Sequence, residues 1–227
     1  GADEAAITRA AEGVGQHHVV EVAGKRLSMA RRDLGGAMQL VLMPEADAAD
    51  ELYLALAEAG GGLVPDVEAG AEGGGAKRSV RGRGIGWLAI NTARIEAGRP
   101  LYHVDFGPDS LPAETGCLDE AVSFTKGCYI GQEVVARMQN LGHPKRKVVG
   151  LTFADGQLPI AGTGLMDEPS GDVIGGVTSS TPSPMNGGEA IALGTVKWGF
   201  HEPGTEVYAA AEGSQVVGTV RESLGVL

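Results

Sequence analysis

The sequence predicts an α+β chain whose C-terminal third forms a separate β domain. In the N-terminal part, apolar residues recur at helical spacing in several segments, and short β-like runs lie between them. From about residue 145 the helical spacing gives way to short β-like runs separated by Gly, Pro and Ser. These observations place a domain boundary near residue 145 and give two predicted domains, residues 1–144 and residues 145–227.

The N-terminal part is predicted to begin with a hairpin-and-helix unit. The expected elements are an Ala-rich helix over 3–12, strands within 18–31 and 37–43, and a helix that starts at Pro44 and ends at Gly60. Proline suits the first position of a helix because no hydrogen bond is lost there. Residues 60–83 hold a glycine-rich run and are expected to form a flexible stretch or surface loop.

The rest of the chain passes from helices to strands. A helix is expected from Ile85 to Ala97, a helical turn near 117–122 and another helix from Gly131. The β-like runs are Val148–Phe153, Asp172–Thr178, Glu189–Leu193, Glu206–Ala210 and Gln215–Arg221. Short strands separated by turn residues are typical of a small antiparallel barrel or a sandwich.

Composition and charge exclude several classes of function. The 29 acidic and 18 basic residues give a net charge of −11, which argues against general nucleic-acid binding. No apolar run is long enough to span a membrane, so no membrane association is expected. The two cysteines, Cys117 and Cys128, form neither a C-x-x-C motif nor a disulfide framework. A reducing cytoplasm is therefore the expected compartment.

The strongest chemical signal lies in residues 126–133, KGCYIGQE. Two glycines bracket Cys128 just before a predicted helix, which permits a sharp turn that a ligand can approach closely. A cysteine near a helix N-terminus and beside a lysine favours the thiolate, the form that attacks electrophiles and binds metals. The alternative is that Cys128 is a small side chain filling a tight turn.

A basic segment stands out in this acidic chain. Residues 126–147 hold Lys126, Arg137, Lys145, Arg146 and Lys147 against one acid, Glu133. The segment therefore carries +4, and the remainder of the chain carries −15. A small basic island suits a small anionic ligand better than a long polyanion. The alternative is a solvated helix end, where basic residues also favour the helix dipole.

Two further groups of residues were weighed for chemistry. Glu96, at the end of a predicted helix, could accept paired hydrogen bonds from the amino and ring N–H groups of a heterocycle. The alternative, which the spacing of Arg94 and Glu96 by itself favours, is that both side chains are exposed at the end of the helix. The histidines are scattered, and a zinc site that combines Cys128 with His143 has no support from spacing, so no metal site is predicted.

Taken together, these segments resemble the YgfZ-type folate-binding proteins, which are relatives of the glycine-cleavage T-protein, an aminomethyltransferase. The resemblance covers most of the chain and is carried by residues 126–133 (KGCYIGQE), 94–98 (RIEAG), 111–116 (LPAETG), 145–151 (KRKVVGL), 175–180 (GGVTSS) and 191–194 (IALG). It implies a T-protein-like folate-binding fold: an α/β region followed by a small C-terminal antiparallel β-barrel.

The resemblance also implies a cofactor and site residues. Tetrahydrofolate, or a one-carbon derivative of it, is the expected cofactor. Cys128 matches the motif cysteine of the YgfZ branch, Glu96 the glutamate that binds the pterin, and Arg146 the arginine near the folate tail. Lys126, Tyr102 and Arg137 complete the expected cofactor-binding set. Because T-proteins proper lack that cysteine, Cys128 favours the YgfZ branch.

Three functions follow from the resemblance. The first is a folate-binding protein that supports assembly or repair of iron–sulfur proteins through Cys128, with those proteins or their assembly factors as partners. The second is an aminomethyltransferase that moves a methylene group to tetrahydrofolate, and the third is a non-catalytic folate-binding module. Residues 1–4 resemble the middle of the family fold, so an N-terminally incomplete fold region and a homodimer that covers exposed edges are expected.

Overall fold

The computed structural model describes residues 4–13, 15–33, 38–60, 84–223 and 225, so the predicted loop over 60–83 lies almost wholly outside the described residues. The chain divides into two units, Gly1–Ala89 and Ile90–Leu227. The barrel begins within the second unit, at Arg146, so the predicted division at residue 145 coincides with the start of the barrel rather than with the division between units. None of the described helices is long and apolar enough to cross a membrane.

The first unit packs helices on a three-stranded antiparallel sheet of order β1-β2-β3. Its elements are α1 (Glu4–Glu12), β1 (His17–Val22), β2 (Lys25–Arg31), β3 (Leu40–Pro44), η1 (Ala46–Ala48) and α2 (Ala49–Ala59). The core joins Val20, Leu27 and Met29 of the sheet to Leu52 of α2. Pro44 ends β3 instead of opening a helix, and the helical segment starts two residues later.

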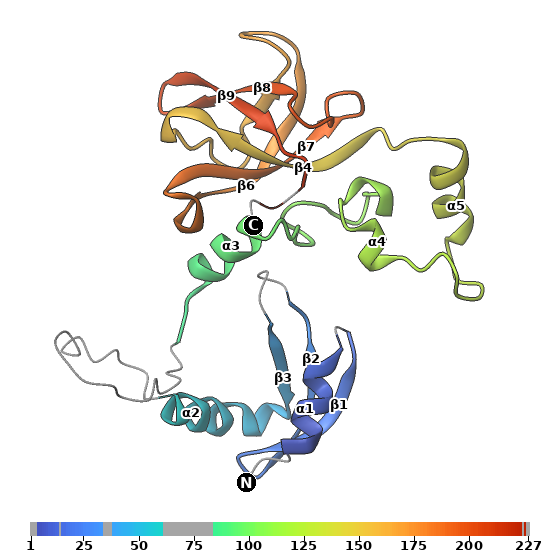
Figure 1. The fold of residues 1–227 in the computed structure, drawn as a ribbon, viewed down its shortest axis with the longest axis vertical. Coiled ribbons are helices and arrows are strands. Elements are labelled where there is room, and N and C mark those ends of the chain that lie inside the picture. Colours follow the sequence, from blue (N-terminus) through green and yellow to red (C-terminus); the bar gives the residue numbers. More distant parts are fainter. Residues whose placement is uncertain (1–3, 14, 34–37, 61–83, 224, 226–227) are drawn as a thin grey trace, which may run out of the picture. The chain divides into compact units, whose positions relative to one another are not determined.

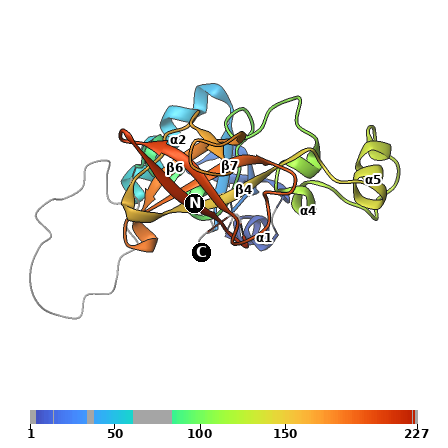
Figure 2. The ribbon, with the colours of Figure 1, turned by 90° about the horizontal axis from the view of Figure 1, so that it is seen from above.

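The helices of the second unit precede its barrel along the chain (Figure 1). They are α3 (Trp87–Glu96), η2 (Pro112–Glu114), α4 (Leu118–Ala121) and α5 (Gln132–Leu141), and α3 starts just before the division between units. Their positions agree with the predicted helices to within two residues or so. Figures 1 and 2 both show α5 at the margin of this unit, away from the barrel strands.

Six antiparallel strands close the C-terminal barrel in the order β4-β7-β6-β5-β8-β9. The strands are β4 (Arg146–Phe153), β5 (Gly164–Met166), β6 (Val173–Ser183), β7 (Glu189–Lys197), β8 (Glu206–Ala211) and β9 (Ser214–Val220), with η3 (Ala154–Gly156) and η4 (Pro184–Asn186) in the connections. The predicted T-protein-like fold class is confirmed, and the barrel is chosen over a sandwich. The three-residue strand β5 was missed.

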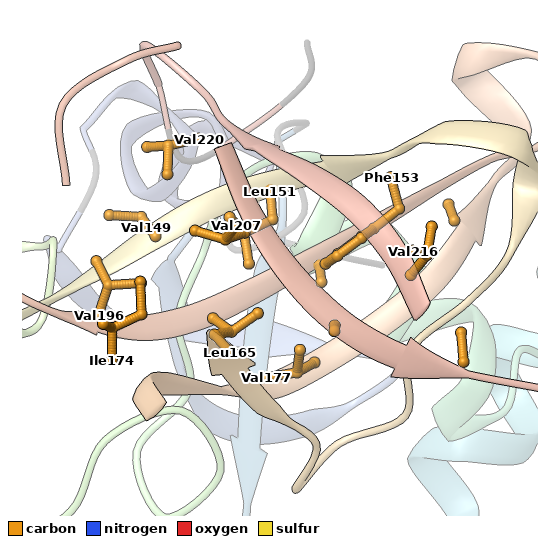
Figure 3. Packing of buried hydrophobic residues seen from close by; sticks show 14 residues of the cluster. Val149, Leu151, Phe153, Leu165, Ile174, Val177, Val196, Val207, Val216 and Val220 are labelled. Atoms are coloured by element: carbon orange, nitrogen blue, oxygen red, sulfur yellow. The ribbon is translucent and has the colours of Figure 1, made fainter. Parts of the chain in front are cut away.

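Alternation along β7 explains why this strand reads as a nearly continuous apolar run. Ala190, Ala192 and Val196 belong to the cluster that fills the barrel, which Figure 3 shows together with residues of the other strands. Ile191 and Leu193 belong instead to a second cluster with Ile95 of α3. Because side chains alternate between the faces of a strand, one face of β7 fills the barrel and the other packs on α3.

Candidate functional site

A buried ion pair fastens α3 to the segment that follows it. Arg94 is fully buried in α3, and its Nη1 lies 2.6 Å from Oδ2 of Asp105, which is 3% exposed. The guanidinium also donates to Ser179 Oγ at 2.6 Å and to Asn91 Oδ1 at 2.9 Å. A charge this deep needs a partner and satisfied hydrogen bonds, and the arginine receives both here.

Asp105 also joins the segment that follows α3 to the barrel. Its Oδ1 accepts hydrogen bonds from the hydroxyls of Thr178 and Ser179 on β6, both at 2.6 Å. Its Oδ2 also accepts from the backbone N–H of Leu101 at 2.8 Å. Both carboxylate oxygens therefore accept hydrogen bonds from the protein. Asp105 holds the turn over residues 101–106 against β6.

A pocket of about 380 Å³ lies beside this turn, entirely within the second unit. Its wall is made by residues of the turn, the Ser110–Glu114 segment and the barrel: His103, Val104, Asp105, Phe106, Gly107, Ser110, Glu114, Arg146, Val148, Thr178 and Thr195. The size falls in the range of roughly 300–1,000 Å³ that small-molecule sites occupy. Its lining includes both apolar and polar residues.

Glu114 and Arg146 form the charged part of the pocket. The Glu114 carboxylate is 9% exposed, and its Oε2 accepts from the Leu111 N–H at 3.1 Å and from Arg146 Nε at 3.4 Å. Within the part of the chain that the structure describes, its Oε1 accepts no hydrogen bond. The Arg146 side chain is half-exposed. The pocket thus offers a free carboxylate oxygen beside an accessible guanidinium.

The same pair also borders a neighbouring pocket. This second hollow, of about 410 Å³, is lined by Asp109, Leu111, Glu114, Met138, Lys145 and Arg146. Because Lys145 and Arg146 both line it, its wall holds two of the basic side chains that the charge pattern singled out. Glu114 and Arg146 therefore line both pockets.

Glu96 lies elsewhere, at the C-terminal end of α3. It is 5% exposed, and its Oε1 accepts from Ser183 Oγ at 2.6 Å and from the Met185 N–H at 3.0 Å. Its Oε2 accepts no hydrogen bond from the described residues. The carboxylate therefore holds the end of β6 with one oxygen and leaves the other for a further donor.

The structure does not bring Glu96 and Arg146 into one pocket. Arg146 pairs with Lys197 at one end of β7, whereas Ser183, the partner of Glu96, pairs with Glu189 at the other end. Eight residues of strand at about 3.3 Å each separate those ends by roughly 26 Å. Glu96 does not line the pocket that Arg146 shares with Glu114.

The remaining predicted site residues lie outside the pocket wall. Cys128 is exposed in the segment between α4 and α5, three residues before Gly131, the N-cap of α5. Nearby, the Lys126 ammonium lies 4.8 Å from the centre of the Tyr129 ring. Arg137 is an exposed residue of α5. Cys128 therefore does not sit in the first turn of the helix, where the dipole acts most strongly.

Tyr102 is half-exposed and lies next to the pocket wall. Its ring centre is 4.0 Å from that of His103 and 5.8 Å from that of Phe106, and both of these residues line the pocket. No group of three or more His, Cys, Asp or Glu side chains that could hold a metal ion occurs among the described residues.

Sequence reasoning missed most of the pocket. Glu114 was noted only as part of the 111–116 loop, and Asp105 and His103 were not singled out. The one signal for His103 and Asp105 is composition: each is a polar residue between apolar or aromatic neighbours. That signal is weak because the partners on β6 lie more than seventy residues away in the chain.

The geometry defines a T-protein-like barrel with a pocket beside its first strand, and comparison with known proteins agrees. Residues 146–224 match the family described as the glycine cleavage T-protein C-terminal barrel domain. The crystal structure of glycine cleavage system aminomethyltransferase T from Bartonella henselae aligns with a TM-score of 0.67 at 24% identity. That alignment covers 96% of this chain and 55% of the other, and it shows the shared fold.

Curated aminomethyltransferases are similar to this chain over most of its length. The aminomethyltransferase of Streptomyces avermitilis is 33% identical over 189 residues, which are 81% of this chain and 45% of that protein. The aminomethyltransferase of Moorella thermoacetica is 32% identical over 195 residues, 85% of this chain and 47% of that protein. The chain thus spans about half the length of these two relatives.

Proposed function

We propose that this chain binds a reduced folate in the pocket that Glu114 and Arg146 share. The observation that carries the proposal is the free Oε1 of a nearly buried carboxylate beside an accessible guanidinium, on a T-protein-like unit. The pterin of folate carries an amino group next to ring N–H groups, and a carboxylate accepts both. The glutamate tail of folate is an anion, which suits Arg146 and Lys145.

The residues of the pocket fit such a ligand. Val104, Phe106 and Val148 supply apolar surface for a flat ring, and the Thr178 and Thr195 side chains supply hydroxyls. Lys147 follows Arg146 directly and adds to the local positive charge. Bound folate would supply the acceptor for a one-carbon unit, and the protein would bind it, orient it and neutralise its tail.

Glu96 remains the pterin ligand that the family resemblance predicts. Its free Oε2 supports that prediction, whereas its distance from Arg146 along the barrel favours Glu114. The two carboxylates are far enough apart in the fold to be tested separately.

Titration calorimetry with tetrahydrofolate kept reduced tests the proposal. We expect saturable binding that weakens roughly tenfold to a hundredfold in Glu114→Gln and in Arg146→Gln, because each removes a charge-assisted hydrogen bond worth about 1.5–3 kcal/mol. Glu96→Gln, measured in parallel, shows which carboxylate holds the pterin. Glu206→Gln, an exposed residue of β8, serves as the control and should bind as the parent does.

The absence of saturable binding to the parent chain would refute the proposal. If Glu96→Gln abolishes binding and Glu114→Gln leaves it intact, the chain still binds folate. The pterin would then lie at the other end of β6, beside Glu96.

Aminomethyl transfer is the reaction that the names of the relatives suggest. In that reaction the methylene group of an aminomethyl-lipoyl carrier passes to tetrahydrofolate, and ammonia is released. The test is ammonia release from a loaded lipoyl carrier protein in the presence of tetrahydrofolate. Release that depends on Arg146 would support transfer, and binding without release would favour a folate-binding module.

An iron–sulfur role for Cys128 is the second candidate function. The observation in its favour is that the thiol is exposed, in a segment where the Lys126 ammonium lies over the Tyr129 ring. Cells that lack this protein would be assayed for iron–sulfur enzyme activity after rescue with the parent, Cys128→Ser or Cys117→Ser. Loss of rescue in Cys128→Ser alone would support the role, and full rescue would exclude it.

A further inference from the structure

His103 adopts a backbone conformation that side chains normally avoid. Its φ is +66°, in the left-handed region, and its N–H donates to the Phe106 carbonyl at 2.8 Å. In that region the Cβ of an L-residue crowds the backbone, and glycine is free of this strain. A histidine here therefore lowers the stability of the turn relative to glycine.

Four other non-glycine residues among those described have positive φ, namely Ala23, Asp33, Ser170 and Glu212, and two of them have a local reason in a hairpin turn. Ala23 and Glu212 also have positive φ, at 52° and 46°. Each is the first residue of a two-residue turn between adjacent hairpin strands, where the twist of the strands demands positive φ. His103 lies in a longer turn between Tyr102 and Phe106, which form an isolated parallel bridge.

His103 lines the candidate pocket, and its imidazole is free of hydrogen bonds to the described residues. The residue is exposed and lines the pocket of about 380 Å³ together with Phe106 and Glu114. Its ring contacts that of Tyr102, with centres 4.0 Å apart. Among the described residues, no side chain or backbone group hydrogen-bonds to the imidazole. The strain is therefore not offset by an internal hydrogen bond of the ring.

The turn that carries His103 is rigidly held. Asp105, two residues on, receives hydrogen bonds from Thr178 and Ser179 and pairs with buried Arg94. These contacts hold the backbone of His103 at the pocket wall before a ligand arrives, which lowers the entropy that the turn loses on binding. Backbone strain that persists in a fastened turn beside a pocket is characteristic of ligand-binding sites.

We propose that His103 is a ligand-contacting residue of this pocket, whose imidazole N–H donates to an acceptor atom on a planar nitrogen heterocycle. The proposal rests on the proposed folate function and adds a residue that recognises the ring from the wall next to Glu114. Asp105 acts through it as a positioning residue.

His103→Gly tests the proposal in the full chain, because glycine removes the ring and relieves the strain together. We expect the free variant to unfold at an equal or higher denaturant concentration than the parent. Tetrahydrofolate should bind it about tenfold more weakly or worse by calorimetry, the fold-change expected for a lost hydrogen bond. Ala23→Gly relieves the same kind of strain in the first unit and should leave binding unchanged.

The outcomes separate this inference from the function on which it rests. Parental affinity in His103→Gly would overturn the contact and leave folate binding intact. A joint fall in stability and affinity would assign His103 a structural role and would also overturn the contact. If the parent chain binds no tetrahydrofolate, both the proposed function and this inference fail.

Discussion

At the scale of single residues, the buried pair between Arg94 and Asp105 organises the candidate site. One carboxylate ties together α3, the 101–106 turn and strand β6, through Arg94, the Leu101 N–H and the hydroxyls of Thr178 and Ser179. The pocket wall therefore depends on a side chain that makes no use of its charge for chemistry. Its role is to hold backbone in place.

Asp105→Asn should destabilise the second unit strongly. The change leaves the Arg94 guanidinium buried without its counter-ion, which costs about 3–5 kcal/mol in comparable sites. Denaturant unfolding followed by Trp198 fluorescence, in a Trp87→Phe background, measures the loss. Glu120→Gln, which breaks an ion pair with Arg99 that is largely exposed on the glutamate side, should change stability by about 1 kcal/mol or less. A comparable effect of both variants would contradict the role given to Asp105.

The two cysteines should differ sharply in reactivity. Burial raises the pKa of the Cys117 thiol, with a further contribution from Glu120, whereas Cys128 is exposed. In Cys128→Ser, alkylation of the remaining thiol should be slow and should need a higher pH than alkylation in Cys117→Ser. Equal rates at pH 8 would contradict this.

The same pKa shift has a consequence for stability. Because the pKa of Cys117 is raised in the folded chain, its deprotonation favours the unfolded chain. The contribution of this thiol to stability is therefore complete below the unfolded pKa and is lost as the pH rises through the folded value. Comparing the parent with Cys117→Ser across that alkaline range measures it.

At the scale of elements, the barrel needs a glycine where one strand lies too close to its neighbour for a side chain. A Cβ on Gly175 of β6 would lie 1.9 Å from the Thr195 carbonyl oxygen of β7, closer than any tolerated contact. A Cβ on Gly164 of the neighbouring β5 would meet only Val173 methyl groups at 3.8 Å, an ordinary distance. The two positions therefore differ in tolerance although both are barrel-strand glycines.

Gly175→Ala should disrupt the β6–β7 ladder, and Gly164→Ala should be tolerated. We expect the first variant to lower the melting temperature by several degrees, since overpacking costs about 1–3 kcal/mol. Thermal unfolding of both variants, with hydrogen exchange at β6 and β7, provides the measurement. An unchanged melting temperature in Gly175→Ala would contradict the strand packing described here.

Helix positions were predicted better than strand positions, for a physical reason. The spacing of apolar residues predicted α2 and α5, an Ala-rich run predicted α1, and Gly98 with Pro100 marked the end of α3, because all of these patterns are local in the chain. Strand β5 was not predicted because three residues are too few to show an alternation of apolar and polar side chains. Strand β6 runs on to Ser183 through polar residues that bond to α3 and its turn, so its length depends on partners about 75 to 90 residues away.

At the scale of the whole molecule, the two units have separate cores. Met29 belongs to the core of the first unit and Leu165 to the core of the barrel, and both are essentially fully buried. Each unit also has its own set of strand pairings. Stability can therefore be lowered in one unit by substitutions confined to its core.

Leu165→Ala should lower protection from hydrogen exchange mainly in the barrel, and Met29→Ala mainly in the first unit. A large-to-small change in a core costs about 2–5 kcal/mol, felt most by the unit that contains it. Hydrogen exchange with peptide-level resolution measures both. Equal loss of protection across the whole chain in either variant would show that the two units unfold together.

The sequence by itself determined the fold class, the approximate place where the barrel begins and the helices, because these follow from local periodicity, turn residues and a recognisable run of motifs. Only the tertiary structure decided which side chains share a pocket. It placed Glu114 beside Arg146 and put Glu96 at the other end of β6, and it turned His103 and Asp105 into neighbours of β6. Such proximities arise from strand register and barrel closure, which join residues far apart in the chain.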